Sequence, residues 1–293
     1  MTIRLDMCKA VAGAREALGD SVEAVKDFLR RKFAPDGGFQ GRDGRSDLYY
    51  TVFGLEASLM LDVDLPRERI TAYLDSFGDG DTLDLVHLAA LIRCRANLAN
   101  VRDAEILMRR LATYRSRDGG FNMIRGEAQG SAYGSFLALG AWQDLGVDCP
   151  NVEAMAQSII SLQRPEGGYA NEASMTAGAT PATAAAICVL HYLKQPIPES
   201  AIRWLLARAH PLGGFCAIPF PGDVGVPDLL STATALHALS LVGAPMDDAR
   251  DKHLDYLDSL WSEEGGFRGH WGDDVVDCEY TYYGLLALGT LTR

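Results

Sequence analysis

The sequence predicts an all-α fold, an α/α toroid in which six inner helices are wrapped by six outer helices. Two repeated features indicate it. A Gly-Gly turn followed by Phe or Tyr separates two helical segments, and the second segment of each pair is the more apolar one. Turns spaced roughly 40 to 50 residues apart are typical of repeat architectures. Because no segment shows sustained period-two alternation with β-branched residues, we expect almost no strand.

The turns divide the chain into six helix-turn-helix units. Five are clear, and their first glycines are Gly37, Gly119, Gly167, Gly213 and Gly265, with spacings of 82, 48, 46 and 52 residues. The first spacing therefore holds two repeats. Near its midpoint, FGDGDTLDLVHLAAL keeps a turn and a second helix without the paired glycines. We expect a single domain over 1–293, with repeats at about 20–61, 62–96, 97–146, 147–194, 195–243 and 244–293.

Helical segments alternate along the chain. An extra helix at about 1–19 comes first and stops at Gly19, and Ser21 is expected to cap the next helix. The outer helices keep a charged face and are expected at roughly 21–33, 65–76, 101–115, 151–163, 198–209 and 247–261. The inner helices are apolar on most sides and are expected at roughly 48–61, 83–95, 131–145, 181–193, 228–242 and 278–291.

Each inner helix begins with a capping residue or a proline. The candidates are Ser46 or Asp47, Thr82, Ser131, Thr180 followed by Pro181, Asp228 after Pro227, and Asp277. Because all six units run in the same direction, all inner N-termini are expected at one rim. Their helix dipoles would present positive ends to one opening, which suits an anionic group such as a diphosphate.

Composition excludes several classes of protein. With 48% hydrophobic and 23% charged residues the chain is ordinary globular material, and its net charge of −12 disfavours a nucleic-acid partner. The six cysteines stand singly without a CxxC pair, so neither a disulfide framework nor a structural zinc module is indicated. The chain has no uninterrupted run of 18 apolar residues, and its N-terminus carries charges, so we expect a cytoplasmic protein without a membrane span.

The repeat as a whole resembles that of a known family. DGGF at Asp36, a polar loop and a second helix with aromatics, ending in GLLAL in the last copy, is similar to the repeat of protein prenyltransferase β subunits and of squalene and terpene cyclases. The resemblance covers about residues 20–291. Phe or Tyr follows the glycines where squalene-type cyclases usually have Trp, which favours the prenyltransferase side. The resemblance implies an isoprenoid diphosphate as ligand and a helical partner subunit.

Prenyltransferase β subunits hold a zinc ion with an Asp-x-Cys pair on the fifth inner helix and a His on the sixth. Here Asp228 matches the Asp, but Leu230 stands at the Cys position and Tyr280 at the His position. Zinc needs three or four close N, S or O ligands, so zinc is disfavoured. The resemblance still places Asp228, Asp277 and Tyr280 at the reaction site.

The cyclase resemblance offers other acids. Asp79-Gly80-Asp81-Thr82 is the nearest match to an Asp-x-Asp-Asp motif, and Asp79 or Asp81 would then protonate an alkene. The alternative is a plain helix start. Asp273-Asp274-Val275-Val276-Asp277 spells the Asp-Asp-x-x-Asp of ionisation-type terpene synthases, so magnesium is possible. The alternative there is a helix cap at Asp277 with solvated loop charges before it.

Two further sets of residues are candidates for binding the substrate. GRDGRSD, with Arg42, Arg45 and Asp47, resembles the family's diphosphate segment, although it lies in the first repeat. The other set is aromatic and comes from the first, third and sixth inner helices: Tyr49, Tyr50, Phe53, Tyr133, Phe136, Tyr280, Tyr282 and Tyr283.

The fourth and fifth inner helices contribute small residues instead: Thr180, Thr183, Ala184, Ala186, Ser231, Thr234 and Ala235. This unevenness predicts a central cavity lined by ring faces, suited to an isoprenoid chain or a carbocation. The alternative is that the aromatics fill the ring. His87 and His237 are candidate bases or core histidines.

These observations favour a toroid that binds an isoprenoid diphosphate and acts on a prenyl chain without the family zinc site. One alternative is a terpene cyclase that uses an unusual Asp acid. The other is a noncatalytic binding or scaffolding toroid.

Overall fold

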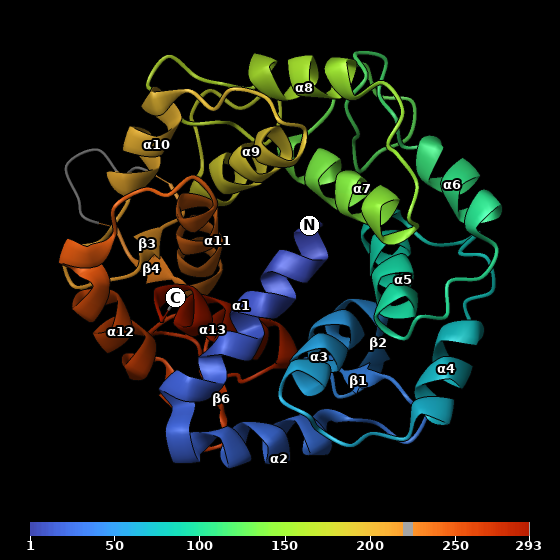
Figure 1. The fold of residues 1–293 in the computed structure, drawn as a ribbon, viewed down its shortest axis with the longest axis vertical. Helices are drawn as coiled ribbons and strands as arrows, with labels where there is room; N and C mark the ends of the chain where they lie inside the picture. Colours follow the sequence, from blue (N-terminus) through green and yellow to red (C-terminus); the bar gives the residue numbers. More distant parts are fainter. Residues whose placement is uncertain (219–224, 293) are drawn as a thin grey trace.

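The computed structural model describes residues 1–218 and 225–292, and its helices form two concentric rings (Figure 1). The inner ring consists of α3 (Leu48–Met60), α5 (Leu85–Asn97), α7 (Ala132–Asp144), α9 (Thr180–Tyr192), α11 (Leu229–Leu241) and α13 (Cys278–Leu291). The outer ring consists of α2 (Val22–Lys32), α4 (Arg67–Asp75), α6 (Ala104–Ala112), α8 (Val152–Ser161), α10 (Glu199–Leu206) and α12 (Arg250–Ser259). Because α13 packs against both α11 and α3, the ring is closed. The predicted α/α toroid is confirmed. Part of the loop of the fifth repeat, residues 219–224, lies outside the described residues.

The inner helices begin close to the predicted residues. Side-chain oxygens accept a hydrogen bond from the first turn of α3, α7, α11 and α13, and they belong to Asp47, Ser131, Asp228 and Asp277. Helix α5 is capped by Asp84, not by Thr82, because the chain makes a further turn in which Leu83 N–H bonds to the Gly80 carbonyl at 3.1 Å. Helix α9 starts at Thr180 with Pro181 in its first turn.

Strand structure in the described residues is limited to short pairs at the turns. The pairs are β1 (Phe39–Gln40) with β2 (Ser46–Asp47), β3 (Phe215–Cys216) with β4 (Pro227–Asp228), and β5 (Trp261–Ser262) with β6 (Gly266–Phe267). All three are antiparallel. The first two pairs draw the residue after the Gly-Gly turn to the start of the following inner helix, as Phe39 opposite Asp47 illustrates.

The residue after the paired glycines is the anchor of each clear repeat. Phe39, Phe121, Tyr169, Phe215 and Phe267 are all buried. The backbone N–H of each donates to a Ser or Thr hydroxyl on the following inner helix, at 2.9 to 3.3 Å: Thr51, Ser135, Thr183, Thr232 and Thr281. The first glycine of each turn has a φ between 89° and 104°, a backbone conformation that disfavours residues with a Cβ. The sequence pattern therefore encodes how each turn is locked to its inner helix.

The extra helix α1 (Ile3–Leu18) crosses the inside of the ring, with the N-terminus near its centre (Figure 1). It packs mainly along α13 and also contacts α3 and α7. It stops at Gly19, which has a φ of 51°, as predicted. Ser21 occupies the N-cap position of α2 as predicted, but it also ends the 3-10 turn η1 (Gly19–Ser21) and its side chain makes no capping bond.

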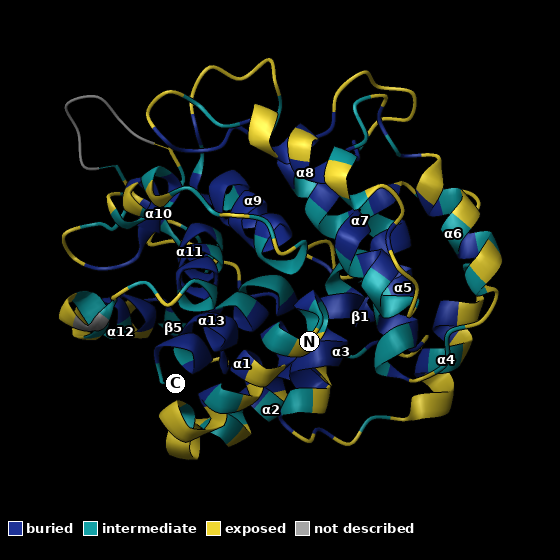
Figure 2. Ribbon diagram, turned by 45° about the horizontal axis from the view of Figure 1, so that its top comes forward, coloured by how far each residue is buried: buried dark blue, intermediate teal, exposed yellow. Residues whose placement is uncertain are grey.

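Burial follows the two rings. Figure 2 shows the inner helices largely buried, while exposed residues concentrate on the outer helices and loops. A second 3-10 turn, η2 (Asp247–Ala249), leads into α12. All six cysteines are buried, as expected for small hydrophobic residues. Within residues 1–218 and 225–292, no helix is both long and apolar enough to cross a bilayer.

Candidate functional site

A cavity of about 550 Å³ lies inside the ring. One side is formed by small or short residues of α9, including Ala182, Ala184, Ala185 and Cys188. The opposite side is aromatic. Tyr49 comes from α3, Tyr133 and Phe136 from α7, and Tyr283 from α13. The difference in side-chain size between the inner helices therefore leaves open space. The alanines of α9 are too short to reach the aromatic side chains on the opposite side of the toroid.

The cavity has one end at the rim and one at α1. Near the rim it is lined by loop residues that precede inner helices, among them Asn171, Met175, Ala217 and Ile218. At the other end it reaches Met7 of α1. The lining is mostly apolar, with Thr234 and His237 of α11 among the polar exceptions. Such a cavity is suited to an elongated apolar ligand.

The aromatic residues named from the sequence occupy three different places. Tyr49, Tyr133, Phe136 and Tyr283 line the cavity, together with His237. Phe53 lies beside it, with its ring centroid 5.1 Å from that of Tyr49, and lines a second cavity of about 70 Å³. Tyr50, Tyr280 and Tyr282 are absent from the lining of both cavities in the described part of the chain.

A half-buried carboxyl group lies next to the aromatic side of the cavity. The Tyr49 hydroxyl donates a hydrogen bond to Glu279 Oε1 at 2.5 Å. Burial raises the pKa of the Glu279 carboxyl above its usual range, and burial also raises the pKa of Tyr133 to about 12. A carboxyl group with a raised pKa next to an apolar cavity is a candidate for proton transfer to or from a bound ligand. Sequence reasoning missed Glu279, although a charged residue in the first turn of an aromatic inner helix was a usable signal.

The rim arginine Arg42 is held by two carboxylates. Its Nε donates to Asp277 at 2.7 Å and its Nη2 to Asp273 at 2.8 Å. The guanidinium also lies over the Tyr280 ring, 5.3 Å from its centroid. Burial raises the pKa of Asp277, whose side chain caps α13. The structure thus joins Arg42, Asp273, Asp277 and Tyr280 in one cluster at the rim.

Other residues named from the sequence lie outside that cluster. Arg45 is exposed and pairs with Asp43 at 2.9 Å. Asp79 and Asp81 both bind Arg110 of the outer helix α6, at 2.7 and 2.6 Å. These two aspartates therefore face the outer ring and not the cavity wall.

A charged cluster on the rim joins the starts of α3 and α5. His87 lies 2.8 Å from Asp84 and 3.8 Å from Asp47, the residue that caps α3. The two carboxylates, Asp47 above all, raise the pKa of His87 to about 9. Aspartates already occupy the positive ends of α3, α5, α11 and α13. The dipoles of these four helices therefore act on the protein's own carboxylates.

The residues at the family's zinc positions do not fit zinc. Asp228 caps α11 by accepting from Ser231 N–H at 2.7 Å, and burial raises its pKa. Leu230 lines the cavity, and Tyr280 lies under Arg42. Among residues 1–218 and 225–292, no three His, Cys, Asp or Glu side chains converge as a metal site would need. Nor do the described carboxylates of the Asp273 to Asp277 segment converge in a group of three that could hold a magnesium ion.

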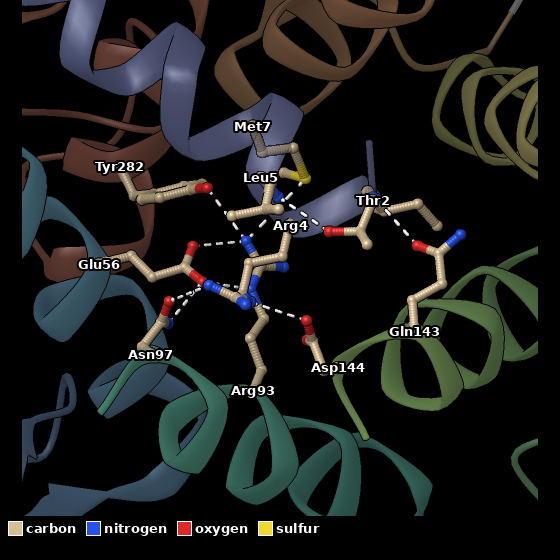
Figure 3. Close-up of polar contacts among 11 residues, drawn as sticks. Thr2, Arg4, Leu5, Met7, Glu56, Arg93, Asn97, Gln143, Asp144 and Tyr282 are labelled. Carbon is tan, nitrogen blue, oxygen red and sulfur yellow. Dashed lines mark hydrogen bonds and ion pairs between the residues drawn. The ribbon is translucent and has the colours of Figure 1, made fainter. Parts of the chain in front are cut away.

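A buried polar cluster lies at the α1 end of the ring (Figure 3). Glu56 of α3, which has no exposed surface, accepts two hydrogen bonds of 2.5 Å from Arg93 of α5. Asn97 donates to Glu56 at 2.8 Å, and Arg93 also donates to the Tyr282 hydroxyl at 3.0 Å. Sequence reasoning missed this cluster, and the signal was a single Glu within the apolar helix FGLEASLML.

Comparison with known proteins supports the fold. The family described as Prenyltransferase alpha-alpha toroid domain matches residues 13–217 and 185–293. No curated protein matches the chain.

Three of the solved structures that are similar to this one illustrate the match. The first is protein geranylgeranyltransferase-I from Candida albicans, complexed with GGPP. It has a TM-score of 0.66 and 15% identity, over 92% of this chain and 90% of that chain. The second is a variant of the type II terpene cyclase MstE from Scytonema, in complex with its substrate geranylgeranyl dihydroxybenzoate. Its TM-score is 0.64, with 15% identity, over 95% of this chain and 97% of that chain.

The third is a protein from Actinoplanes, with a TM-score of 0.62 and 16% identity, over 94% of this chain and 99% of that chain. At these identities the solved structures establish the arrangement of helices. The sequence match spans nearly the whole ring. The chain therefore belongs to the prenyltransferase α/α-toroid family.

Proposed function

We propose that the central cavity binds an isoprenoid chain and that the protein transfers this chain to an acceptor without a zinc ion. The observation that carries the proposal is the cavity of about 550 Å³, with aromatic rings on one side and alanines on the other. Its size falls within the range of about 300 to 1,000 Å³ that ligand pockets occupy. The geranylgeranyltransferase-I and MstE structures described above both hold a geranylgeranyl group, which supports the same class of ligand here.

Prenyl transfer breaks the bond between C1 of the isoprenoid and its diphosphate and forms a bond from C1 to a nucleophile. The nucleophile must lose a proton. In our proposal the Tyr49 hydroxyl takes that proton while giving its own to Glu279, since the two are already hydrogen-bonded at 2.5 Å. The faces of Tyr133 and Tyr283 stabilise the positive charge that develops on C1. The diphosphate leaves as the anion.

The diphosphate is expected at the rim, where Arg42 is the candidate cation. Arg42 is shared between Asp273 and Asp277, so it must exchange one carboxylate for a phosphate oxygen. This exchange weakens the contribution of the diphosphate to affinity. We therefore expect the apolar chain to supply most of the binding free energy.

The proposal is tested by filling the cavity. Ala185 of α9 lines it, and Ala185→Phe places a ring in the space that the chain would occupy. Calorimetry should give an affinity for farnesyl diphosphate that is at least about tenfold lower for this variant, because each lost buried methylene costs about 0.8 kcal/mol. Ala112→Phe, on the exposed side of α6, is the matched control and should bind as the wild type does. Equal affinities for the two variants would contradict the assignment of the cavity.

A second function is favoured by one observation. Burial raises the pKa of the Glu279 carboxyl, which favours its protonated form, and a protonated carboxyl next to the cavity would serve as the acid in a cyclisation. Analysis of the products separates the two functions, since cyclisation gives ring products without an acceptor. If the protein binds no isoprenoid, the remaining hypothesis is a noncatalytic binding or scaffolding toroid. Co-purification with a helical protein would support the partner subunit that the family resemblance implies.

A further inference from the structure

We propose that α1 is the floor of the cavity and that Met7 limits the length of the isoprenoid chain that it accepts. This inference rests on the proposed function of the cavity. It assigns a role in chain-length selection to the extra N-terminal helix, whose residues 3–12 precede the segment matched by the family.

The first step is that α1 is fixed at one end of the ring. Arg4 donates to Asp144 at 2.7 Å and to Asn97 at 2.8 Å, and these are the last residues of α7 and α5 (Figure 3). The backbone N–H of Ile3 donates to Gln143 Oε1 at 2.8 Å. A cation next to two helix C-termini is favourable because helix dipoles are negative there.

Further contacts extend along the helix. Arg15 bonds to Asp62 at 2.7 Å, just beyond α3, and Asp6 accepts from the hydroxyl of Tyr192, the last residue of α9. Gly289 of α13 allows α1 to approach closely, because a Cβ there would lie 1.7 Å from the Ala10 carbonyl oxygen. The helix is therefore tied to the C-terminal ends of α3, α5, α7 and α9 and packed on α13. It closes the end of the ring opposite the rim.

The second step concerns Met7. This residue is buried and lines both the cavity of about 550 Å³ and the smaller cavity of about 70 Å³. Its Sδ lies 3.9 Å from Arg93 Nη2 in the polar cluster. Met7 thus stands where an apolar chain entering from the rim meets the closed end. Shortening its side chain would extend the apolar space toward the smaller cavity, which also reaches Val52, Val86 and Leu137.

The test compares two chain lengths on each variant. Dissociation constants for farnesyl and geranylgeranyl diphosphate are measured by calorimetry, and their ratio is taken for each protein. The ratio cancels any loss of folded protein, because both ligands are measured on the same sample. Met7→Ala should shift the ratio about tenfold toward the longer chain, and Met7→Phe should shift it toward the shorter one. Leu5→Ala, an exposed position on the same helix, is the matched control and should leave the ratio unchanged.

The outcomes are distinct. Opposite shifts of the ratio in the Met7→Ala and Met7→Phe variants would support the role of α1 as the floor of the cavity. A wild type that binds isoprenoids, with a ratio that neither Met7 variant changes, would overturn the inference while leaving the proposed function intact. A wild type that binds neither diphosphate would overturn both. The Met7→Leu variant keeps nearly the same volume and should retain the wild-type ratio.

Discussion

At the scale of the residue, the proposed proton transfer depends on two side chains near the cavity mouth, Tyr49 and Glu279. Glu279 is in the first turn of α13 and Tyr49 in the first turn of α3, so the hydrogen bond of 2.5 Å between them crosses the point where the ring closes. Burial holds the pKa of the carboxyl above its usual range. A carboxyl group whose pKa is raised in this way, and which lies close to a ligand-sized space, is a candidate for proton transfer.

Removing the carboxylate should therefore affect turnover more than binding. We expect Glu279→Gln to lower kcat by about 10² to 10⁴, the usual contribution of a general acid or base, with little change in the affinity for isoprenoid. Steady-state kinetics and calorimetry on the same variant measure the two effects. Glu263→Gln, in the exposed part of the sixth turn, is the control. A Glu279→Gln enzyme with wild-type kcat would rule out this role.

His87 gives a prediction for stability against pH. Its pKa is raised to about 9 by Asp47 and Asp84, whereas an unfolded His titrates near 6.5. The stabilisation is therefore fully present below about pH 6.5 and is lost as pH rises through about 9. The imidazole of His87 is about a third exposed, so solvent screening reduces this stabilisation to roughly 1 kcal/mol.

We expect His87→Gln to lower the free energy of unfolding by about 1 kcal/mol at pH 6 and by much less at pH 10. Urea unfolding at the two pH values measures the difference. His191→Gln, whose ring packs edge-on against Tyr192, provides a control histidine on another inner helix. An equal loss at both pH values would show that the carboxylates do not act on His87 as described.

At the scale of the element, the repeat depends on how each turn meets its inner helix. Gly54 lies within α3, and a Cβ there would come within 2.3 Å of the Phe39 ring; Gly284 and Phe267 repeat the relationship in α13 with 2.4 Å. The glycine is required because the buried aromatic ring occupies the position of its missing side chain. The same turn is held by the hydrogen bond from Phe39 N–H to Thr51 at 2.9 Å.

This contact predicts opposite effects for two glycine substitutions in inner helices. Gly54→Ala should lower the free energy of unfolding by about 2 kcal/mol, because the ring must move. Gly140→Ala in α7 is the matched control, since the nearest atom to its Cβ would be 4.0 Å away. It should raise stability by about 0.5 to 1 kcal/mol through helix propensity. Urea unfolding measures both, and a stabilising Gly54→Ala would contradict the packing described.

Some helices and turns could be predicted from the sequence and others could not. The alternating helices were predictable because the turn recurs and the five clear copies supply similar local signals: a glycine with positive φ, a buried aromatic, and a capping residue or a proline at the helix start. The prediction for the second repeat was less exact, since its turn lacks the paired glycines and the aromatic residue after them, and its helix cap is Asp84 and not Thr82. The place of α1 was not predictable, because contacts such as Ile3 to Gln143 join residues 140 positions apart.

At the scale of the whole molecule, the ring creates one closed and one open end. Inner helices all point the same way, so their starts form the rim, and α1 contacts α13 and the ends of α3, α5, α7 and α9. The sequence indicated which inner helices carry rings and which carry small residues. It could not indicate that Tyr280 and Tyr282 contact Arg42 and Arg93 and do not line the cavity, because both contacts form only when α13 closes the ring against α3. The candidate site is a product of that closure.

The most direct test of this account is a crystal structure of the protein with farnesyl diphosphate. We expect electron density for the isoprenoid chain between Tyr283 and Ala185, with its C1 end toward the rim and its far end against Met7. Density for the ligand elsewhere, with the cavity filled only by water or by rearranged side chains, would contradict the central claim that this cavity is the isoprenoid site.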